Sequence, residues 1–317
     1  MRGVDLSVFD FDYDLSWHAV LLGADGNVLG RFGGRDADTP AKYQTLAGLK
    51  HSLAAALQLH KAQQNGNDKT PPRKQSFAES YSAASKRTET ACIHCHHVNE
   101  FRRDQMQREG GWSLDDVWVY PRPENLGLTL DAEQGDRVVS VLANSPAGKV
   151  GLKAKDVLRR IGKVPIASVA DAQYALQQAP KKGELAIVWQ NGEREKRGII
   201  VLQDGWRKTD VSWRWSLKSL SPNPSIIGED LDLEGRKRLG LKPEQLAYRH
   251  MNFLTPTARH AGLLANDVIV GIDDQMLTMN ARQFETHVRL YCKVGQEITL
   301  NVLRGNERVK VKLKLPE

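Results

Sequence analysis

A short stretch that occurs twice constrains the fold of this chain more than any other feature of its sequence. The first copy spans residues 144–158 and the second spans residues 255–269. A glycine in each copy can end a helical turn in the left-handed conformation, and an aspartate can hold the loop before a strand. Such a repeat predicts two modules of one fold. The identical pairs are Ala147/Ala258, Gly151/Gly262, Leu152/Leu263, Ala154/Ala265, Asp156/Asp267 and Val157/Val268.

Both copies continue in the same way, with a strand, a helix and a pair of strands. Asn191-Gly192 and Gly305-Asn306 lie between apolar runs, which is typical of a β-hairpin turn. The first module is expected to have a strand at 157–161, a helix from about Val169 and strands at 185–189 and 198–202. The second is expected to have a strand at 268–272, a helix at 280–291 and strands at 297–303 and 309–315.

The sequence Leu-Gly-Leu begins each module, at residues 126–128 and 239–241. With it, the layout resembles the PDZ domain, particularly the tandem PDZ domains behind bacterial high-temperature-requirement serine proteases. The resemblance implies a mixed α+β fold that is mainly β, in which each module is a partly open barrel. We assign the first PDZ-like domain to residues 116–204 and the second to residues 236–317.

The resemblance also implies a peptide groove in each module. In PDZ domains, backbone N–H groups of the loop with this sequence hold a chain-terminal carboxylate, and the peptide adds a strand beside a helix. The loop glycine would be needed because a side chain would obstruct the anion. The facing helix would begin at Ser168, with Asp171 as its capping partner. The implied peptide-binding residues are Asn125, Leu126, Gly127, Leu128, Asp171, Ala175, Leu239, Gly240 and Leu241.

Two alternatives to peptide binding follow from the same residues. One or both modules could be structural, and the second is the weaker binding candidate because its loop leads into Pro243, which has no N–H. A protease is not expected. The chain has neither a Gly-x-Ser-x-Gly motif nor a glycine-flanked serine of trypsin type, and the residues before the first module are too few for a double-barrel protease.

Residues 1–61 are expected to form a small α/β segment. Apolar runs at 17–22 and 28–32 flank a turn, and Thr39-Pro40 can open a helix that reaches about Lys61. The apolar stripe of this helix would be Leu46, Leu49, Leu53, Leu57 and Leu59. Two strands and a closing helix resemble the second half of a thioredoxin fold, truncated before its redox Cys-x-x-Cys half. A small α+β appendage is the alternative.

A polar linker at residues 62–76 leads into a helical segment at 77–115 that contains a Cys-x-x-Cys-His motif. This spacing is the attachment signature of c-type haem, in which two thiols add to vinyl groups and the histidine ligates iron. It predicts haem attachment through Cys92 and Cys95 with His96 as the ligand. Asn99 or Glu100, one turn on, could hold the other nitrogen of the His96 ring.

Three other uses of this motif stay open. Zinc or copper could be held by Cys92 and Cys95 together with two of His94, His96 and His97, because two sulfur and two nitrogen ligands suit zinc. A redox dithiol at the start of a helix would have a lowered thiol pKa. The thiols could also hold no cofactor.

The connector at residues 205–235 is unusually aromatic for a linker. It carries Trp206, Trp213 and Trp215 beside two arginines. Because large aromatic side chains usually serve cores and contacts between domains, we expect them to pack. A role in stacking against a ligand is the alternative.

The bulk composition excludes some partners. The net charge is +7, but the 45 basic residues are interleaved with 38 acidic ones, so a nucleic-acid groove is not expected. No apolar stretch is long enough to span a membrane. The chain starts without a signal peptide, which taken literally predicts a cytoplasmic protein. It also enters as though in mid-domain, so a missing N-terminus is possible, and the resemblance and the haem motif imply the periplasm or cell envelope.

The sequence as a whole predicts a protein-binding adaptor of the envelope type. Its PDZ grooves would bind C-termini or extended segments of partner proteins, with haem or a metal at Cys92, Cys95 and His96. The first alternative is an electron-transfer or redox protein whose PDZ modules serve docking. The second is an accessory component of a PDZ-protease system.

Overall fold

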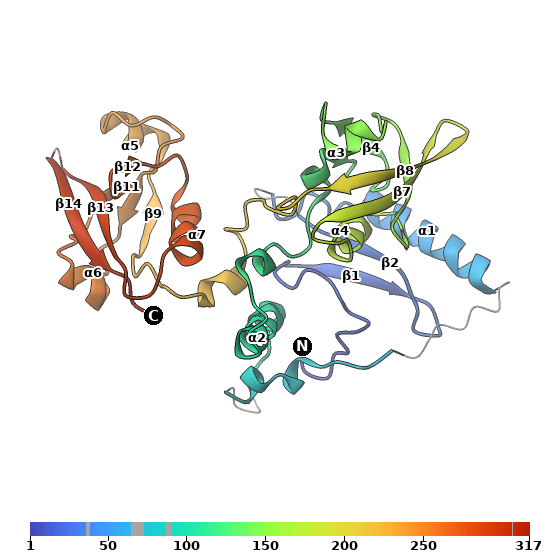
Figure 1. Cartoon of the computed structure of the whole chain (residues 1–317), viewed down its shortest axis with the longest axis horizontal. Coiled ribbons are helices and arrows are strands. Elements are labelled where there is room, and N and C mark those ends of the chain that lie inside the picture. Colours follow the sequence, from blue (N-terminus) through green and yellow to red (C-terminus); the bar gives the residue numbers. More distant parts are fainter. Residues whose placement is uncertain (36–38, 65–72, 87–90, 306) are drawn as a thin grey trace. The chain divides into compact units, whose positions relative to one another are not determined.

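The computed structural model describes residues 1–35, 39–64, 73–86, 91–305 and 307–317. They divide into two compact units, Met1–Thr209 and Asp210–Glu317, and each unit is described by itself. Each contains one of the two repeated modules, drawn in Figure 1 in green to yellow and in orange to red. Asn306, expected in the second hairpin turn, lies outside the described residues, as does the part of the linker at 65–72.

The module of the first unit consists of two small sheets and a helix around one apolar core. Strand β3 pairs with β4, and a second antiparallel sheet has the order β6-β5-β7-β8. Leu128, Leu176 and Trp189 meet in the core. The elements are η4 (Pro123–Leu126), β3 (Leu128–Leu130), β4 (Val138–Val141), α3 (Pro146–Lys149), β5 (Val157–Ile161), β6 (Val164–Pro165), α4 (Val169–Gln177), β7 (Gly183–Asn191) and β8 (Arg194–Leu202).

The module of the second unit has the same order of elements with one addition. Its strands form one sheet in the order β14-β13-β11-β10-β9, with β12 paired to β11. Helix α5 lies between β9 and β10, where the first module has only a loop. The elements are β9 (Gly228–Asp230), α5 (Leu233–Arg238), β10 (Tyr248–His250), α6 (Pro256–His260), β11 (Val268–Ile272), β12 (Gln275–Met276), α7 (Ala281–Tyr291), β13 (Glu297–Arg304) and β14 (Glu307–Lys314).

The roles predicted for the repeated stretch are confirmed. Gly151 and Gly262 have φ angles of 88° and 84°, in the left-handed region that ends a helical turn. Asp156 and Asp267 each accept a hydrogen bond from the backbone N–H three residues before, at 2.9 Å in both modules. The same short sequence therefore builds the same turn twice. The described strands form open sheets, and no closed barrel is present among them.

The N-terminal part of the first unit forms the expected hairpin and helix. Strand β1 (His18–Leu22) pairs only with β2 (Val28–Gly33) among the described strands, and α1 (Leu46–Gln64) packs on β2. The helix begins at Leu46 and not at Thr39, because residues 40–43 form turns. Leu46, Leu53 and Leu57, expected in the buried stripe, are 67%, 48% and 53% exposed. The order of elements agrees with the expectation, while the thioredoxin-like assignment stays a prediction.

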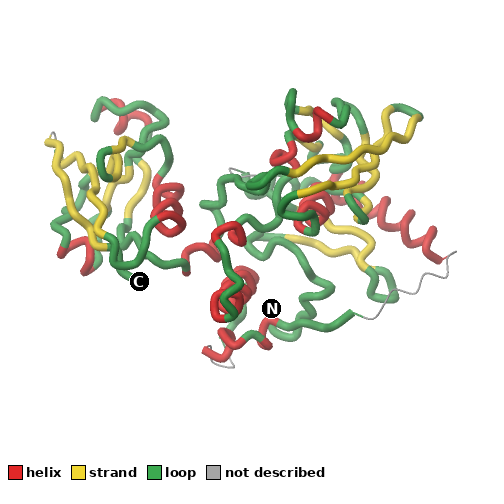
Figure 2. Tube along the Cα trace, in the orientation of Figure 1, coloured by secondary structure: helices red, strands yellow, loops and turns green. Residues whose placement is uncertain are grey.

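The Cys-x-x-Cys-His segment has a small core of its own. Helix α2 (Cys95–Arg108) follows the short 3-10 helices η1 (Ala78–Ser80) and η2 (Ser82–Lys86). Val98 and Phe101 of α2 pack with Leu6 and Tyr13, which belong to the loops that precede β1 (Figure 2). The first residues of the chain therefore pack with α2, and Asp5 and Phe77 form an isolated antiparallel bridge.

The connector contributes to the cores of both units. Trp206 is buried in the core of the first module, and its indole N–H donates to the Pro180 carbonyl at 3.1 Å. In the second unit, the 3-10 helix η5 (Trp215–Ser219) lies against α7, and Arg289 donates to the Leu220 carbonyl at 2.6 Å. Trp206 and Trp213 are 9% exposed and Trp215 is 58% exposed. Two of the three tryptophans thus pack as expected.

None of the helices in the described part of the chain combines the length and apolar character needed to cross a bilayer.

Candidate peptide grooves and histidine cluster

The loop before β3 has the position that a PDZ carboxylate loop requires. It runs through η4 into β3, and the side chains of Leu126 and Leu128 are buried in the core of the module. Asn125 donates through its side-chain nitrogen to the carbonyls of Trp206 and Lys208, at 3.0 and 3.3 Å. Asn125 therefore fastens the loop to the chain that follows the module.

Gly127 is required for a reason that differs from the expected one. Its φ is 80°, and a Cβ built on it would lie 2.3 Å from the Cβ of Ser145 and 3.2 Å from the Cβ of Leu142. The substituent would thus collide with the turn after β4, and it would not stand in the path of an anion. A Gly127→Val substitution would disturb the fold of the loop and could not report on carboxylate access.

Asp171 and Ala175, expected to face the first groove, are both buried. One oxygen of Asp171 accepts the backbone N–H of Arg31 at 2.9 Å, and the other accepts from Ala167 and from the Ser168 hydroxyl at 3.3 and 3.0 Å. Burial raises the pKa of Asp171 to about 6, against the opposing effect of the Arg31 charge and these hydrogen bonds. The expectation that these residues line an open groove is therefore corrected: β2 lies against them.

Besides β2, the residues just before α1 also contact the first module, near its carboxylate loop. Tyr43 is 3% exposed and belongs to the core of the first module, and its hydroxyl donates to Glu124 at 3.2 Å. The Thr45 hydroxyl donates to the carbonyl of Ala132, just past the end of β3, at 3.1 Å. Figure 1 shows the hairpin β1–β2 running past α4. Strand β2 and residues 43–45 thus lie along the face of the module where a PDZ ligand would bind.

The second loop lies at a different place in the sequence from the expected one. β9 pairs with β10 as β3 pairs with β4, and Met251 N–H donates to the Ile227 carbonyl as Leu142 N–H does to Gly127. The loop before β9, residues 225–228, is therefore the counterpart of the first carboxylate loop. Residues 239–241 instead end helix α5, where Leu239 is the C-cap and Gly240 has a φ of 67°.

The side of the second module that corresponds to a PDZ groove is more exposed than that of the first. Three residues of α7 are buried (Ala281, Phe284 and Val288), while seven of the nine residues of α4 are buried. In β9, Glu229 and Asp230 are exposed, and β9 is an edge strand of its sheet among the described residues. Asp230 also accepts the backbone N–H of Ala281 at 2.9 Å, so one end of β9 is joined to the start of α7.

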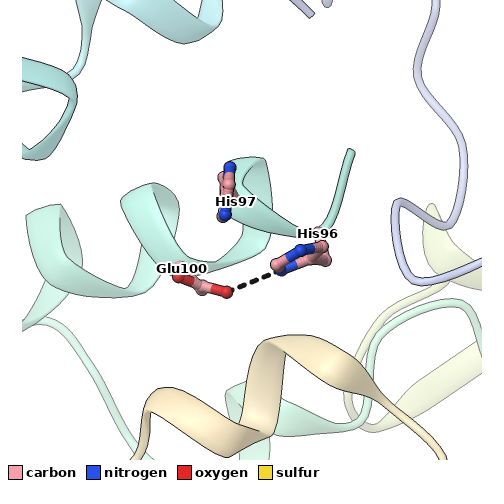
Figure 3. Close-up of side chains that lie close together, drawn as sticks. All are labelled: His96, His97 and Glu100. Carbon is pink, nitrogen blue, oxygen red and sulfur yellow. Dashed lines mark hydrogen bonds and ion pairs between the residues drawn. The ribbon is translucent and has the colours of Figure 1, made fainter. Parts of the chain in front are cut away.

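Three potential ligand side chains meet on one face of α2. Figure 3 shows His96, His97 and Glu100, whose ligand atoms all lie within 4.8 Å of one another. Nδ1 of His96 lies 2.7 Å from the Glu100 carboxylate. Glu100, one of the two expected partners, thus contacts the His96 ring, while the side chain of Asn99 donates to Asp14 at 2.9 Å. No other cluster of this kind is found among the described residues.

The side chain of His97 is part of the N-terminal cap of α2. Its Nδ1 accepts the backbone N–H of His94 at 2.9 Å, which completes a capping box. A nitrogen that accepts a hydrogen bond carries no proton, so the neutral ring is protonated on Nε2 and has no lone pair there for a metal. His97 could bind a metal only by giving up the cap. His94, the N-cap residue, is exposed.

The two thiols do not join the histidine cluster. Cys92 is exposed, and Cys95, the first residue of α2, is half-buried against the core around Phe101. The structure therefore does not bring Cys92 and Cys95 together with two histidines as a tetrahedral zinc site would need. An arrangement with two thiols at the start of a helix and His96 in its first turn is compatible with attachment of a haem edge to the thiols.

Comparison with known proteins identifies the modules. The PDZ domain models match residues 137–191 and 246–315. A probable periplasmic serine endoprotease DegP-like of Pseudomonas putida (strain GB-1) is 28% identical over 222 residues, which are 68% of this chain and 45% of that protein. The periplasmic serine endoprotease DegP of Escherichia coli (strain K12) is 26% identical over 183 residues, 57% of this chain and 35% of that protein.

Solved structures give a weaker match. The HtrA-type protease AlgW with tripeptide aligns at 16% identity and a TM-score of 0.29, covering 57% of this chain and 58% of that one. The chain spans less than half the length of the curated relatives it matches. It contains two PDZ domains and is similar over this part to periplasmic proteases of the DegP type.

Proposed function

We propose that this chain is a protein-binding adaptor whose second PDZ domain takes up extended or C-terminal segments of partner proteins. The observation that carries this proposal is that β9 is an edge strand among the described residues and that fewer residues are buried in α7 than in α4. β9 and α7 correspond to the strand and helix that border a PDZ groove. A partner segment would add to the edge of β9, where backbone N–H and C=O groups give affinity and side-chain pockets give specificity.

The loop before β9 is compatible with this role. Ile226 is buried in the core, as Leu126 is in the first domain, and Ile227 stands where the first domain has Gly127. A side chain at this position of the first domain would point toward the turn after β4, so Ile227 is not expected to block the groove. Because the similar proteins are named as periplasmic, we also propose the periplasm or envelope as the place of action, with an accessory role beside a protease.

Binding to the second domain should be sensitive to one position on α7. Thr286 is the sixth residue of α7, as Tyr174 is of α4, and Tyr174 contacts the segment that covers the first domain. We expect the full chain to select peptides from an extended and C-terminal peptide library with micromolar Kd, about −8 kcal/mol or weaker, because the peptide must be ordered. Thr286→Arg should weaken binding at least about tenfold, or about 1.4 kcal/mol.

Arg308→Ala, at an exposed position of β14, is the matched control and should bind as the parent does. Fluorescence anisotropy with selected peptides measures the affinities. A library without any binder, or equal affinity in the Thr286→Arg and parent proteins, would argue against the proposed groove.

A second candidate function concerns the Cys-x-x-Cys-His motif. We propose that Cys92 and Cys95 would hold a covalently attached c-type haem with His96 as an iron ligand, which would give the chain an electron-transfer role. The contact between His96 Nδ1 and Glu100 favours this proposal, because a carboxylate on the second ring nitrogen fixes the tautomer and raises the basicity of the ligand nitrogen. Attachment adds each S–H across one vinyl C=C bond and needs no oxidant. Haem would supply one-electron chemistry when bound.

This candidate predicts a difference between compartments. Protein exported with a haem-ligation pathway should show a Soret band that survives acid-acetone extraction, and Cys92→Ala/Cys95→Ala should lose it. Glu100→Gln should keep the haem but raise its reduction potential, because the imidazole becomes a weaker donor. Exported wild-type protein without a Soret band, or with stoichiometric zinc on the same thiols, would rule haem out in favour of an empty or metal-loaded site.

A further inference from the structure

We propose that the groove of the first PDZ domain is occupied by the chain's own residues 28–35 and 39–52, so that a partner segment binds there only by displacing them. This inference rests on the proposed ligand-binding role of PDZ grooves, but it concerns the other domain. It predicts a closed first site beside an accessible second one within one protein.

The helix side of the groove is held through the backbone of one residue of β2. Arg31 donates its N–H to Asp171 at 2.9 Å, and its carbonyl accepts the Ser168 hydroxyl at 2.5 Å. Its guanidinium lies 3.4 Å from the centroid of the Tyr174 ring, within the range of a cation–π contact. Both main-chain polar groups and the side chain of Arg31 are therefore bonded to side chains of α4 and its N-cap, while β2 pairs with β1 and not with β3 among the described strands.

The strand side is held by the chain that leads into α1. Tyr43 reaches Glu124 in the carboxylate loop, Thr45 reaches Ala132 beyond β3, and His51 of α1 lies 3.0 Å from Asp136. These three contacts follow one another along the groove from the loop to the far end of β3. Residues 43–51 therefore contact the domain from the carboxylate loop to the connection between β3 and β4.

The direction of this segment distinguishes it from a C-terminal ligand. Residues 43–45 run from the carboxylate loop toward the end of β3, which is the direction of β3 itself. A peptide whose terminal carboxylate sits at the loop must run the opposite way. The first groove is thus filled by an internal segment that presents a tyrosine hydroxyl, and no carboxylate, to the loop.

Little space is left between the segment and the domain. Phe32 and Tyr43 are 4% and 3% exposed. A Cβ added to Gly48 would lie 2.6 Å from the Ala132 carbonyl oxygen, and one added to Gly34 would lie 2.8 Å from the Gln173 side chain. These approaches mean that a partner segment cannot share the groove with residues 28–35 and 39–52. It must compete with them.

Displacement is plausible because the occupying segment has little stability of its own. A two-stranded sheet with one helix is marginal in water, so undocking exposes a segment that can unfold locally while the domain keeps its core. When only a fraction of the molecules is open, the apparent affinity for a partner falls by that fraction. A substitution that loosens the segment should therefore raise apparent affinity without any change in the groove.

The test uses the full chain carrying Thr286→Arg, which removes the second groove from the measurement. The probe is a fluorescent synthetic peptide with the sequence of residues 28–52. Parent protein should bind it weakly, while Tyr43→Ala should bind it at least about tenfold more tightly, because the cis segment loses its buried anchor. Tyr43→Phe keeps the ring and loses only the bond to Glu124, so it should stay close to the parent.

A milder variant keeps the test decisive if Tyr43→Ala unfolds the first unit. Thr45→Ala/His51→Ala removes two rim contacts and spares the buried ring, and it should also bind the probe more tightly than the parent. Circular dichroism confirms that each variant is folded. If every folded variant binds the probe as weakly as the parent does, or if all bind it equally, the proposal is wrong. Neither result would touch peptide binding by the second domain, which is measured with position 286 restored.

Discussion

A fragment of residues 1–61 is expected to show no cooperative thermal transition and rapid amide exchange throughout. Its strands β1 and β2 pair only with each other among the described strands, and a two-stranded sheet is marginal on its own. Its most buried aromatic residues find their partners elsewhere: Tyr43 in the core of the first PDZ domain, and Tyr13 in the core around α2. Removing these partners removes most of the apolar burial that could offset the cost of ordering the chain.

The fragment of residues 1–209 is the matched control, because it contains both partners and forms one compact unit. It should unfold cooperatively in the same circular-dichroism experiment. Leu46, Leu53 and Leu57 of α1 stay exposed even in this unit, so the smaller fragment would also present an apolar stripe and should tend to aggregate. A cooperative transition of the isolated fragment of residues 1–61 would contradict the prediction.

The repeated modules could be predicted because their signals are local. Gly151 and Gly262 end a helical turn, and Asp156 and Asp267 hold the next loop, within a few residues of each other in the sequence. Hairpins and the strand after each turn follow from alternating apolar runs and Asn-Gly turns. Elements of this kind need no information from distant parts of the chain, and the structure has them close to the expected residues.

The position of the second carboxylate loop could not be predicted from the position of the first by assuming a constant offset between the two modules. Helix α5 is inserted between β9 and β10, so the spacing of the repeat changes at this point. Leu239-Gly240 resembles the first loop because glycine serves equally well in a left-handed C-cap. The run Ile226-Ile227-Gly228 before a short strand was the available signal, and its pairing with β10 identifies it.

The packing of β2 on α4 could not be predicted from the sequence, for a different reason. The bond from Arg31 to Asp171 joins residues 140 positions apart, and nothing in either local pattern specifies it. The pattern of Ser168 followed three residues later by Asp171 predicts an ordinary capping pair, and this pair is present. The same carboxylate also accepts a hydrogen bond from the backbone N–H of Arg31 in β2, which only the tertiary structure reveals.

This buried carboxylate gives the second large prediction, an unusual pH dependence of stability. Desolvation raises the pKa of Asp171 to about 6 in the folded protein, against an ordinary value of 3.8. Between these values the folded state binds a proton that the unfolded state releases, so the contribution of Asp171 to the free energy of unfolding decreases as pH rises from about 4 to about 6. The full difference corresponds to about 3 kcal/mol. Stability contributed by this group is therefore greatest below about pH 4.

The measurement compares urea unfolding of the 1–209 fragment and its Asp171→Asn variant from pH 4 to pH 7. Asparagine keeps an acceptor for the Arg31 N–H but does not titrate, so subtracting the two curves cancels all other groups, including Asp136, whose pKa is also raised by burial. The difference should favour the wild type increasingly as pH falls from 7 to 4. A flat difference would mean that solvent reaches Asp171. It would then follow that β2 does not stay docked on α4, which would also count against the closed first groove.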